Sequence, residues 1–341
     1  FSALGDVAMT IPVIHSLAVQ YPQHEITVLS RAVWQPLFQG LPTNVGFVGA
    51  DLTGKHKGLW GLNSLYSELK AMHFDYIADF HHVLRSKYLC LRFRLANKPV
   101  ASICKGRAGK KKLVRRHDKV MENQKSSFRR YADVLEKLGL PVLLNFSSIY
   151  GEGKGNFAEI EPVTGPKEDQ KWIGIAPFAR YFTKVYPAEL MKTVINNLSQ
   201  KGYAIYLFGN GAHEYNIMQS LIAESPNASI VPDKLSFQEQ LEFMATLDVM
   251  VSMDSANMHL ASLVNIPVAS IWGGTTPLCG FLGWQQSKEN AICMDLPCQP
   301  CSISGTAECP LHHFSCMNSI SPDRVIQNIE NIITLNKNKR S

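Results

Sequence analysis

The chain has 341 residues, of which 45% are hydrophobic and 18% charged, values typical of a globular protein with one large or two ordinary domains. No apolar run reaches the roughly 18–20 residues that a membrane span needs, and no charged-then-apolar leader is present, so we expect a soluble or peripheral protein in a reducing compartment. The net charge of +6 is unevenly distributed along the chain. Residues 1–165 hold 22 Lys and Arg against 13 Asp and Glu, whereas residues 166–341 hold 12 against 15.

The positive charge is concentrated in residues 105–119. The basic residues of this run are Lys105, Arg107, Lys110, Lys111, Lys112, Arg115, Arg116 and Lys119. The run fits either a solvated loop or a surface that meets phosphorylated lipid or an anionic membrane. Because no aromatic residues are interleaved with these charges, we expect no nucleic-acid partner.

The first half of the chain alternates predicted helices and strands. Apolar residues share one helical face over residues 7–19, which places Asp6 at a helix N-terminus, where aspartate commonly serves as the N-cap. The chain does not begin with Met, so we expect that a few preceding residues, including a first strand, are missing. Strands are predicted at residues 25–30 and 74–80, and a helix at residues 128–138.

Three polar side chains follow the strand predicted at residues 74–80. His81, His82 and Arg85 stand where the carboxyl end of that strand meets the next connection. Open α/β sheets bind their ligands at this edge, so these side chains are candidates for contact with a polar acceptor. The alternative is that the two histidines are ordinary surface residues.

A break in composition divides the chain near its middle. Residues 151–166 are dense in glycine, proline and polar side chains, as an interdomain linker is. We therefore expect an N-terminal domain over residues 1–150, a C-terminal domain over residues 167–325, and a C-terminal helix and tail over residues 326–341. Both halves alternate strand and helix, which predicts an α/β fold with two Rossmann-like domains.

The second half begins with predicted strands at residues 171–176 and 204–208. Lys184, after the first of them, is either a surface lysine or a cation that reaches a diphosphate. Glu214, after the second, is either a glutamate favoured by the helix dipole or a ligand contact. The turn before Glu214 is not the dinucleotide-binding fingerprint, because Glu214 stands where a third glycine is needed.

A buried strand at residues 249–253 leads into the most informative segment. Asp254 and Ser255 are good N-caps for a helix that begins directly after them, and His259 lies early in that helix. The helix N-terminus would present N–H groups to a phosphate at the carboxyl edge of the sheet. The alternative is that Asp254 and Ser255 only cap the helix and that His259 only packs.

A second buried strand, at residues 266–272, is followed by a short polar loop. Together the two strand ends resemble the carboxy-terminal signature of glycosyltransferase family 9, Asp-(Ser/Thr)-Gly-x-x-His and then Gly-x-Thr-Asp-Pro. The matching residues are Asp254, Ser255, His259, Gly273, Thr275 and Pro277. Ala256 replaces the glycine and Thr276 replaces the aspartate.

The same family resemblance extends to other segments. Gly5-Asp6 followed by Pro12 is similar to the family's amino-terminal signature, Lys184 with Pro187 to its Lys-Arg-Trp-Pro motif, and Arg85-Ser86 to an Arg-Ser pair. The resemblance implies a GT-B-type fold, with two Rossmann-like domains facing a central cleft. It also implies metal-independent, inverting transfer of a heptose from ADP-heptose to a lipid-linked anionic glycan, such as the lipopolysaccharide core, at the cytoplasmic face of the inner membrane.

The resemblance further assigns roles to residues. It makes Asp6 the general base, and its Arg-Ser pair supports Arg85 as an acceptor contact beside His81. The donor contacts that it implies are Lys184, Glu214, Asp254, Ser255, His259 and Thr275. Two alternatives stay open: a nucleotide-sugar epimerase of the same fold, and a catalytically silent nucleotide-sugar-binding protein.

Four cysteines gather near the end of the chain: Cys298, Cys301, Cys309 and Cys316. The first pair has zinc-knuckle spacing, and four thiolates can fill a tetrahedral coordination shell. One hypothesis is therefore that these four cysteines bind a structural zinc ion. No cofactor is expected for the reaction itself. Disulfides and plain buried thiols are the alternatives, and His312 and His313 offer competing ligands.

Overall fold

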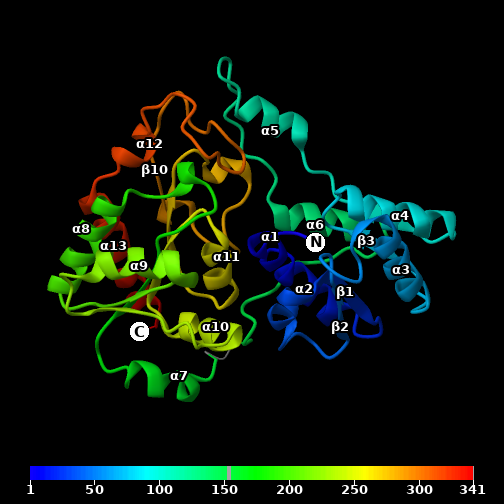
Figure 1. Ribbon diagram of the computed structural model, residues 1–341, viewed down its shortest axis with the longest axis horizontal. Helices are drawn as coiled ribbons and strands as arrows, with labels where there is room; N and C mark the ends of the chain where they lie inside the picture. The colour runs from blue at the N-terminus through cyan, green and yellow to red at the C-terminus, as the bar shows by residue number, and fades with distance from the viewer. Residues whose placement is uncertain (152–154, 341) are drawn as a thin grey trace. The chain divides into compact units, whose positions relative to one another are not determined.

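The computed structural model describes residues 1–151 and 155–340, and it separates into two compact units (Figure 1). One unit consists of residues 1–106 and 125–149, the other of residues 107–124 and 150–341. The chain therefore crosses between the units three times. The expected N-terminal domain, residues 1–150, differs from the first unit in the basic segment 107–124, which belongs to the second unit.

The first unit contains two pairs of parallel strands. Strand β1 (Ile26–Arg31) pairs with β2 (Val45–Ala50), and β3 (Ile77–Asp79) pairs with β4 (Val100–Ser102). Its helices are α1 (Leu4–Ala8), α2 (Ile11–Gln20), α3 (Gly58–Lys70), α4 (Leu84–Leu95) and α6 (Ser127–Glu136), with the 3-10 helix η1 (Ala32–Phe38) after β1. One core of this unit is formed where the inner faces of α3 and α4 meet, and it includes Leu65, Tyr66 and Phe93.

The helix predicted over residues 7–19 is two helices. Helix α1 ends at Ala8, and α2 begins at Ile11 with Pro12 in its first turn. Proline lacks an N–H and its ring clashes with the carbonyl four residues earlier, so one continuous helix through Pro12 is disfavoured. Asp6 is not an N-cap as expected. Ala3 holds that position, and Asp6 lies in the first turn of α1.

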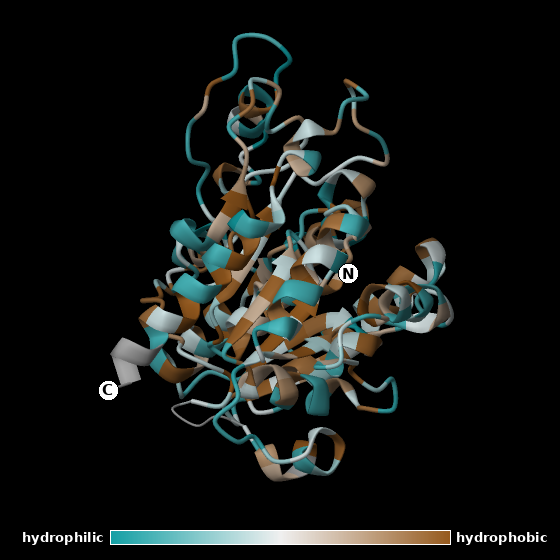
Figure 2. Ribbon diagram, turned by 90° about the vertical axis from the view of Figure 1, so that its left-hand side faces the viewer, coloured by the Kyte–Doolittle hydropathy of each residue, from teal (hydrophilic) through white to brown (hydrophobic). Residues whose placement is uncertain are grey.

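The second unit is built on one parallel six-stranded sheet in the order β10-β9-β8-β5-β6-β7. Its strands are β5 (Trp172–Ala176), β6 (Ala204–Leu207), β7 (Ala228–Ile230), β8 (Val249–Met253), β9 (Val268–Trp272) and β10 (Ala291–Cys293). Every residue of β5, β8 and β9 is buried, as expected for strands covered on both faces. Figure 2 shows these central strands as mostly hydrophobic, between helices of mixed polarity.

Helices cover both faces of this sheet. One group of helices shares a core with the strands: α8 (Ala188–Gln200), α9 (Gly211–Ile222) and α13 (Pro322–Arg340). Helices α10 (Phe237–Thr246) and α11 (Ala256–Leu263) lie outside this core, and Phe243 of α10 packs against Trp172 and Tyr206 of the sheet. Shorter helices are α5 (Arg107–Leu113), α7 (Phe157–Thr164), α12 (Ser315–Asn318), η2 (Phe182–Lys184), η3 (Pro277–Cys279) and η4 (Lys288–Asn290).

Two expected boundaries differ from the structure. The linker expected at residues 151–166 contains α7, while residues 152–154 lie outside the described part of the chain. The tail expected from residue 326 is part of the domain, because Ile326, Ile329 and Ile332 belong to the buried core of the second unit. Among the described residues, no helix combines the length and the apolarity that crossing a bilayer requires.

Candidate active site

In the first unit, Asp6 and His81 are close enough to interact electrostatically. Asp6 is exposed on α1, and its carboxylate accepts a hydrogen bond from the Ser2 hydroxyl. His81 follows β3 at the carboxyl end of that strand. Arg85 is exposed in the first turn of α4. The structure thus brings the expected base and one expected acceptor contact into one neighbourhood of this unit.

Asp79 organises the loop that carries the two histidines. Its carboxylate is buried and accepts hydrogen bonds from the backbone N–H groups of His81 (2.9 Å) and His82 (2.8 Å) and from the Ser86 hydroxyl (3.1 Å). The Ser86 hydroxyl also accepts the N–H of Val83 at the start of α4. Asp79 was not among the predicted site residues, although an aspartate that ends a strand before two histidines was the available signal.

His81 is held as a neutral imidazole near pH 7. Burial lowers the pKa of His81 to about 4. Nearby positive charges, including Lys105, also lower this pKa, whereas Asp6 and Asp79 raise it. Its Nδ1 atom is buried and has no hydrogen-bond partner within residues 1–151 and 155–340. A neutral imidazole can donate or accept a hydrogen bond, which suits contact with a sugar hydroxyl.

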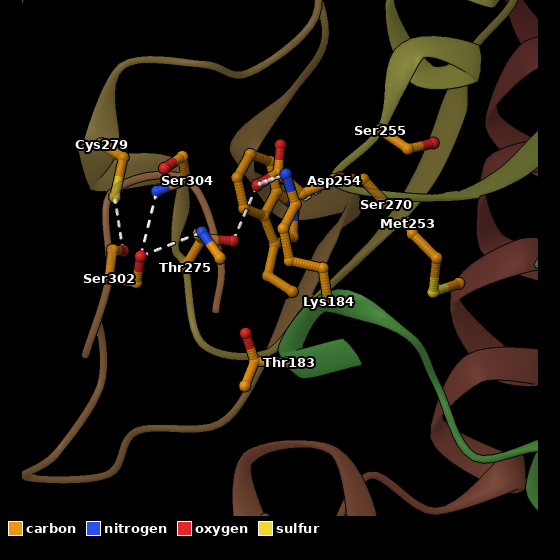
Figure 3. A network of polar contacts seen from close by, with 12 residues as sticks. Thr183, Lys184, Met253, Asp254, Ser255, Ser270, Thr275, Cys279, Ser302 and Ser304 are labelled. Carbon is orange, nitrogen blue, oxygen red and sulfur yellow. Dashed lines mark hydrogen bonds and ion pairs between the residues drawn. The ribbon is translucent and has the colours of Figure 1, made fainter. Parts of the chain in front are cut away.

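In the second unit, a buried ion pair connects three of the sheet's central strands. Lys184 Nζ, from the loop after β5, lies 3.0 Å from Asp254 Oδ2, directly after β8, and the Thr275 hydroxyl, after β9, donates to the same oxygen at 2.7 Å (Figure 3). The side chains of Lys184 and Asp254 are only 15% and 6% exposed. An ammonium group has three N–H donors, so Lys184 can hold Asp254 and still donate to a phosphate oxygen.

Glycine is required where the loop after β9 meets the loop after β5. A Cβ atom on Gly273 would lie 2.5 Å from the carbonyl oxygen of Thr183, which is backbone and cannot move aside. The N–H of Gly274 donates to this same carbonyl at 2.7 Å, and its own carbonyl accepts from the N–H groups of Cys301 and Ser302. These bonds fix Lys184, the next residue after Thr183, relative to Thr275.

Helix α11 begins at Ala256, directly after Asp254 and Ser255 as predicted, and its N-terminus lies beside this ion pair. Ser255 is its N-cap, but the Ser255 side chain makes no capping hydrogen bond within the described residues, and its hydroxyl lies 3.3 Å from the Ser252 hydroxyl. Asp254 does not cap the helix either, because Lys184 and Thr275 bind its carboxylate. The α11 N-terminus therefore keeps its favourable dipole for an anion. His259 is buried within α11.

Glu214 makes the contact expected of a helix-capping residue. Its Oε2 atom accepts the backbone N–H of Asn210, the N-cap of α9, at 2.8 Å. The side chain is half-buried, at the carboxyl edge of the sheet after β6. The structure thus shows the capping role of Glu214, and its contact with the donor stays a prediction.

The four cysteines line one pocket together with His313, whose Nε2 atom lies 3.8 Å from Cys298 Sγ. Burial raises the pKa of Cys316 to about 12, and the three other thiols add to this increase. Within the described part of the chain, no group of three or more His, Cys, Asp or Glu residues is arranged to hold a metal ion. The sulfurs are gathered but do not form a closed ligand shell, so structural zinc stays a prediction.

Comparison with known proteins identifies the family. The family model described as glycosyltransferase family 9 (heptosyltransferase) matches residues 62–312, well over half of the chain. The chain belongs to glycosyltransferase family 9. The family-9 resemblance seen in the sequence is thereby confirmed.

Relatives of this family-9 chain match it over most of their length. Lipooligosaccharide heptosyltransferase 2 of Campylobacter jejuni is 24% identical and the match covers 97% of this chain and 96% of the relative. A family-9 glycosyltransferase of Veillonella parvula superposes with a TM-score of 0.73 at 19% identity, covering 98% of this chain and 95% of that one. E. coli heptosyltransferase WaaC with ADP-2-deoxy-2-fluoro heptose superposes with a TM-score of 0.64 at 15% identity, covering 97% of each chain. These superpositions confirm the predicted α/β fold of the GT-B type.

Proposed function

We propose that this family-9 protein transfers a heptose from ADP-heptose to a lipid-linked, anionic glycan of the lipopolysaccharide-core type. The observation that carries the proposal is the buried Lys184–Asp254–Thr275 network beside the α11 N-terminus. It sets positive charge and N–H donors at the carboxyl ends of three adjacent strands, where a diphosphate binds in open α/β sheets. The family match and the name of the C. jejuni relative support the choice of sugar.

The proposed chemistry is a single displacement with inversion. As the acceptor hydroxyl oxygen attacks the anomeric carbon, its proton passes to the Asp6 carboxylate, and the bond from that carbon to the diphosphate oxygen breaks to release ADP. Lys184 and the α11 N-terminus stabilise the charge that develops on the departing diphosphate, so that no metal ion is required for this task. Ser255 and Thr275 add hydroxyl contacts, and His259 orients the turn.

The remaining contacts complete the two substrate sites. Glu214 binds the donor ribose, while His81 and Arg85 bind polar groups of the acceptor. The excess of Lys and Arg in residues 1–165 matches an anionic acceptor and supports a location at the cytoplasmic face of the inner membrane. The absence of a nucleic-acid-binding pattern in the basic run agrees with a lipid-linked glycan partner.

Two variants separate donor binding from chemistry. Lys184→Met should weaken ADP binding, measured by calorimetry, by about ten- to a hundredfold, because a charged hydrogen bond is lost. Asp6→Asn should leave ADP binding intact but lower kcat by about 10²–10⁴-fold, because the proton acceptor is removed. The matched control is Lys192→Met, a half-buried lysine of the same unit that pairs with Glu224.

Other outcomes would reject the proposal. Equal stabilisation by ADP-, UDP-, GDP- and CMP-linked sugars in thermal melts would remove the donor assignment. Consumption of ADP-heptose without an acceptor, with an altered sugar nucleotide as product, would indicate an epimerase. Donor binding without any turnover, in the presence of core acceptors, would indicate a binding protein.

A further inference from the structure

Helix α4 has a row of exposed leucines on its solvent-facing side. Three of its leucines are largely exposed: Leu84 by 86%, Leu91 by 53% and Leu95 by 74%. Spaced at i, i+7 and i+11, these leucines lie on one face of the helix, opposite Leu89 and Phe93, which are buried against α3. Contiguous exposed apolar side chains on a folded domain mark an interaction surface.

The neighbouring helix α3 extends this surface. Trp60, in the first turn of α3, is 88% exposed, and Leu59 beside it is 64% exposed. Helices α3 and α4 lie side by side, since the Tyr66 ring packs against Phe93 in their shared core (Figure 1). We call Leu59, Trp60, Leu84, Leu91 and Leu95 the apolar stripe.

The charges along helix α4 and the segment that follows it are of one sign. Residues 80–106 contain no Asp or Glu, and they contain six basic residues: Arg85, Lys87, Arg92, Arg94, Lys98 and Lys105. On α4, Lys87 and Arg94 are exposed and flank the leucines along one side. On α3, Glu68 is paired with Lys55.

We propose that the apolar stripe and its basic flank dock this unit on the surface of an anionic lipid bilayer. Leucine and tryptophan side chains enter the boundary between headgroups and acyl chains, while Lys87 and Arg94 remain at the level of the lipid phosphates. The inference rests on the proposed function for its lipid-linked acceptor, and it assigns the surface and the partner that bring the enzyme to that acceptor.

Charge selects this partner over a second copy of the chain. In a two-fold dimer built on this face, each copy would contribute the same patch, so Lys87 and Arg94 would be placed among basic residues of the other copy. Phospholipid headgroups such as phosphatidylglycerol supply the negative charge that such a dimer lacks. An anionic bilayer therefore buries the exposed leucines and also places negative charge beside Lys87 and Arg94.

The test is co-sedimentation of the full chain with vesicles that contain neither donor nor acceptor. Vesicles of phosphatidylethanolamine and phosphatidylglycerol should bind the protein, phosphatidylcholine vesicles should bind it much less, and added salt should weaken the binding. Leu91→Gln/Leu95→Gln should lower the partition coefficient into the anionic vesicles by about tenfold or more, because two apolar side chains are lost. Lys87→Gln/Arg94→Gln should lower both the binding and its salt dependence.

The matched control is Val33→Gln/Leu143→Gln, which removes two exposed apolar side chains elsewhere in the same unit. It should bind vesicles as the unaltered protein does, and all the variants should retain ADP binding and thermal stability. Unchanged vesicle binding by Leu91→Gln/Leu95→Gln, or no binding by the unaltered protein, would overturn the inference. So would an oligomer, seen by light scattering, that this variant dissociates, because a second copy would then cover the stripe.

The two proposals fail separately. Vesicle binding that depends on the stripe, in a protein that binds no ADP, would reject the proposed function and keep the docking surface. ADP binding and transfer to a detergent-solubilised acceptor, with no vesicle binding, would reject the docking surface alone.

Discussion

At the scale of single residues, the candidate site in the second unit is built on a buried ion pair. Asp254 is buried, and the Lys184 ammonium and the Thr275 hydroxyl both bind its carboxylate. Removing one partner from such a buried pair is strongly destabilising, because the other charge stays desolvated. The pair therefore places Lys184 before any ligand arrives, which lowers the entropic cost of binding.

His81 provides a pH-dependent test at this scale. Its pKa of about 4 in the folded protein is below the 6.5 of an unperturbed histidine. Between these values the unfolded chain binds a proton that the folded chain does not, so stability should fall as the pH is lowered from about 6.5 towards 4 and should not change on this account at higher pH. His81→Gln should reduce this loss in urea unfolding experiments.

The titration of His81 is also visible directly. In an NMR titration, the His81 ring signal, identified by its absence in His81→Gln, should change with a midpoint near pH 4. A midpoint at or above the 6.5 of an unperturbed histidine would show that the charged form is stabilised, for example by Asp6 or Asp79, and would contradict the neutral acceptor contact.

At the scale of elements, strands with a continuous apolar pattern were predicted best. The strand predicted at residues 249–253 is β8 without any change of bounds, and the helix expected after Ser255 is α11. Burial on both faces demands an unbroken apolar run, which the sequence displays directly. Helix α4 was missed, because its exposed leucines blur the amphipathic pattern, and α5 was missed within the basic run.

The candidate site was predicted only in part, for a related reason. Local signatures marked Lys184, Asp254 and Thr275, but no local signal shows that their side chains share one ion-pair network. That contact depends on β5, β8 and β9 being neighbours in the sheet. Asp79 was missed because its partners are the backbone N–H groups of a loop, whose conformation the sequence does not display.

The cysteine loop allows a test of metal binding at the scale of an element. If the four thiols bind structural zinc, the purified protein should contain about one zinc ion per chain by elemental analysis, because a Cys₄ set fills one tetrahedral shell. Cys309→Ser should lower both the zinc content and the melting temperature. Cys104→Ser, an exposed cysteine of the first unit, is the control. A metal-free protein with unaltered stability would leave these residues as plain thiols.

At the scale of the whole molecule, the segment 107–124 joins the second unit through specific contacts. Lys119 Nζ donates to the carbonyl oxygens of Cys298 and Pro300, the latter at 2.7 Å, and the N–H of Gln124 donates to the carbonyl of Leu278 at 2.9 Å. Lys110 lies over the Phe281 ring at 4.2 Å. The basic run is therefore not simply a solvated loop, although Lys111 and Lys112 are exposed.

These contacts predict the protease sensitivity of the segment. Lys119→Met should release it from the carbonyls of Cys298 and Pro300, so that trypsin cleaves at Arg115 and Arg116 several times faster than in the unaltered protein. Lys111→Met, an exposed lysine of α5, should leave the rate at these two sites unchanged. The fragments are identified and quantified by mass spectrometry. Equal cleavage rates in both variants would show that Lys119 does not anchor the segment.

The three crossings also have a consequence for synthesis on the ribosome. Lys119 and Cys298 are separated by 179 residues, so the segment leaves the ribosome long before its docking partners exist. At about 5–20 residues per second, roughly 10–35 seconds pass before the intervening chain has been translated. During that interval the nascent chain carries a cluster of lysines and arginines that has no docking surface. The second unit completes its fold only when a segment made early in translation meets a loop made near its end.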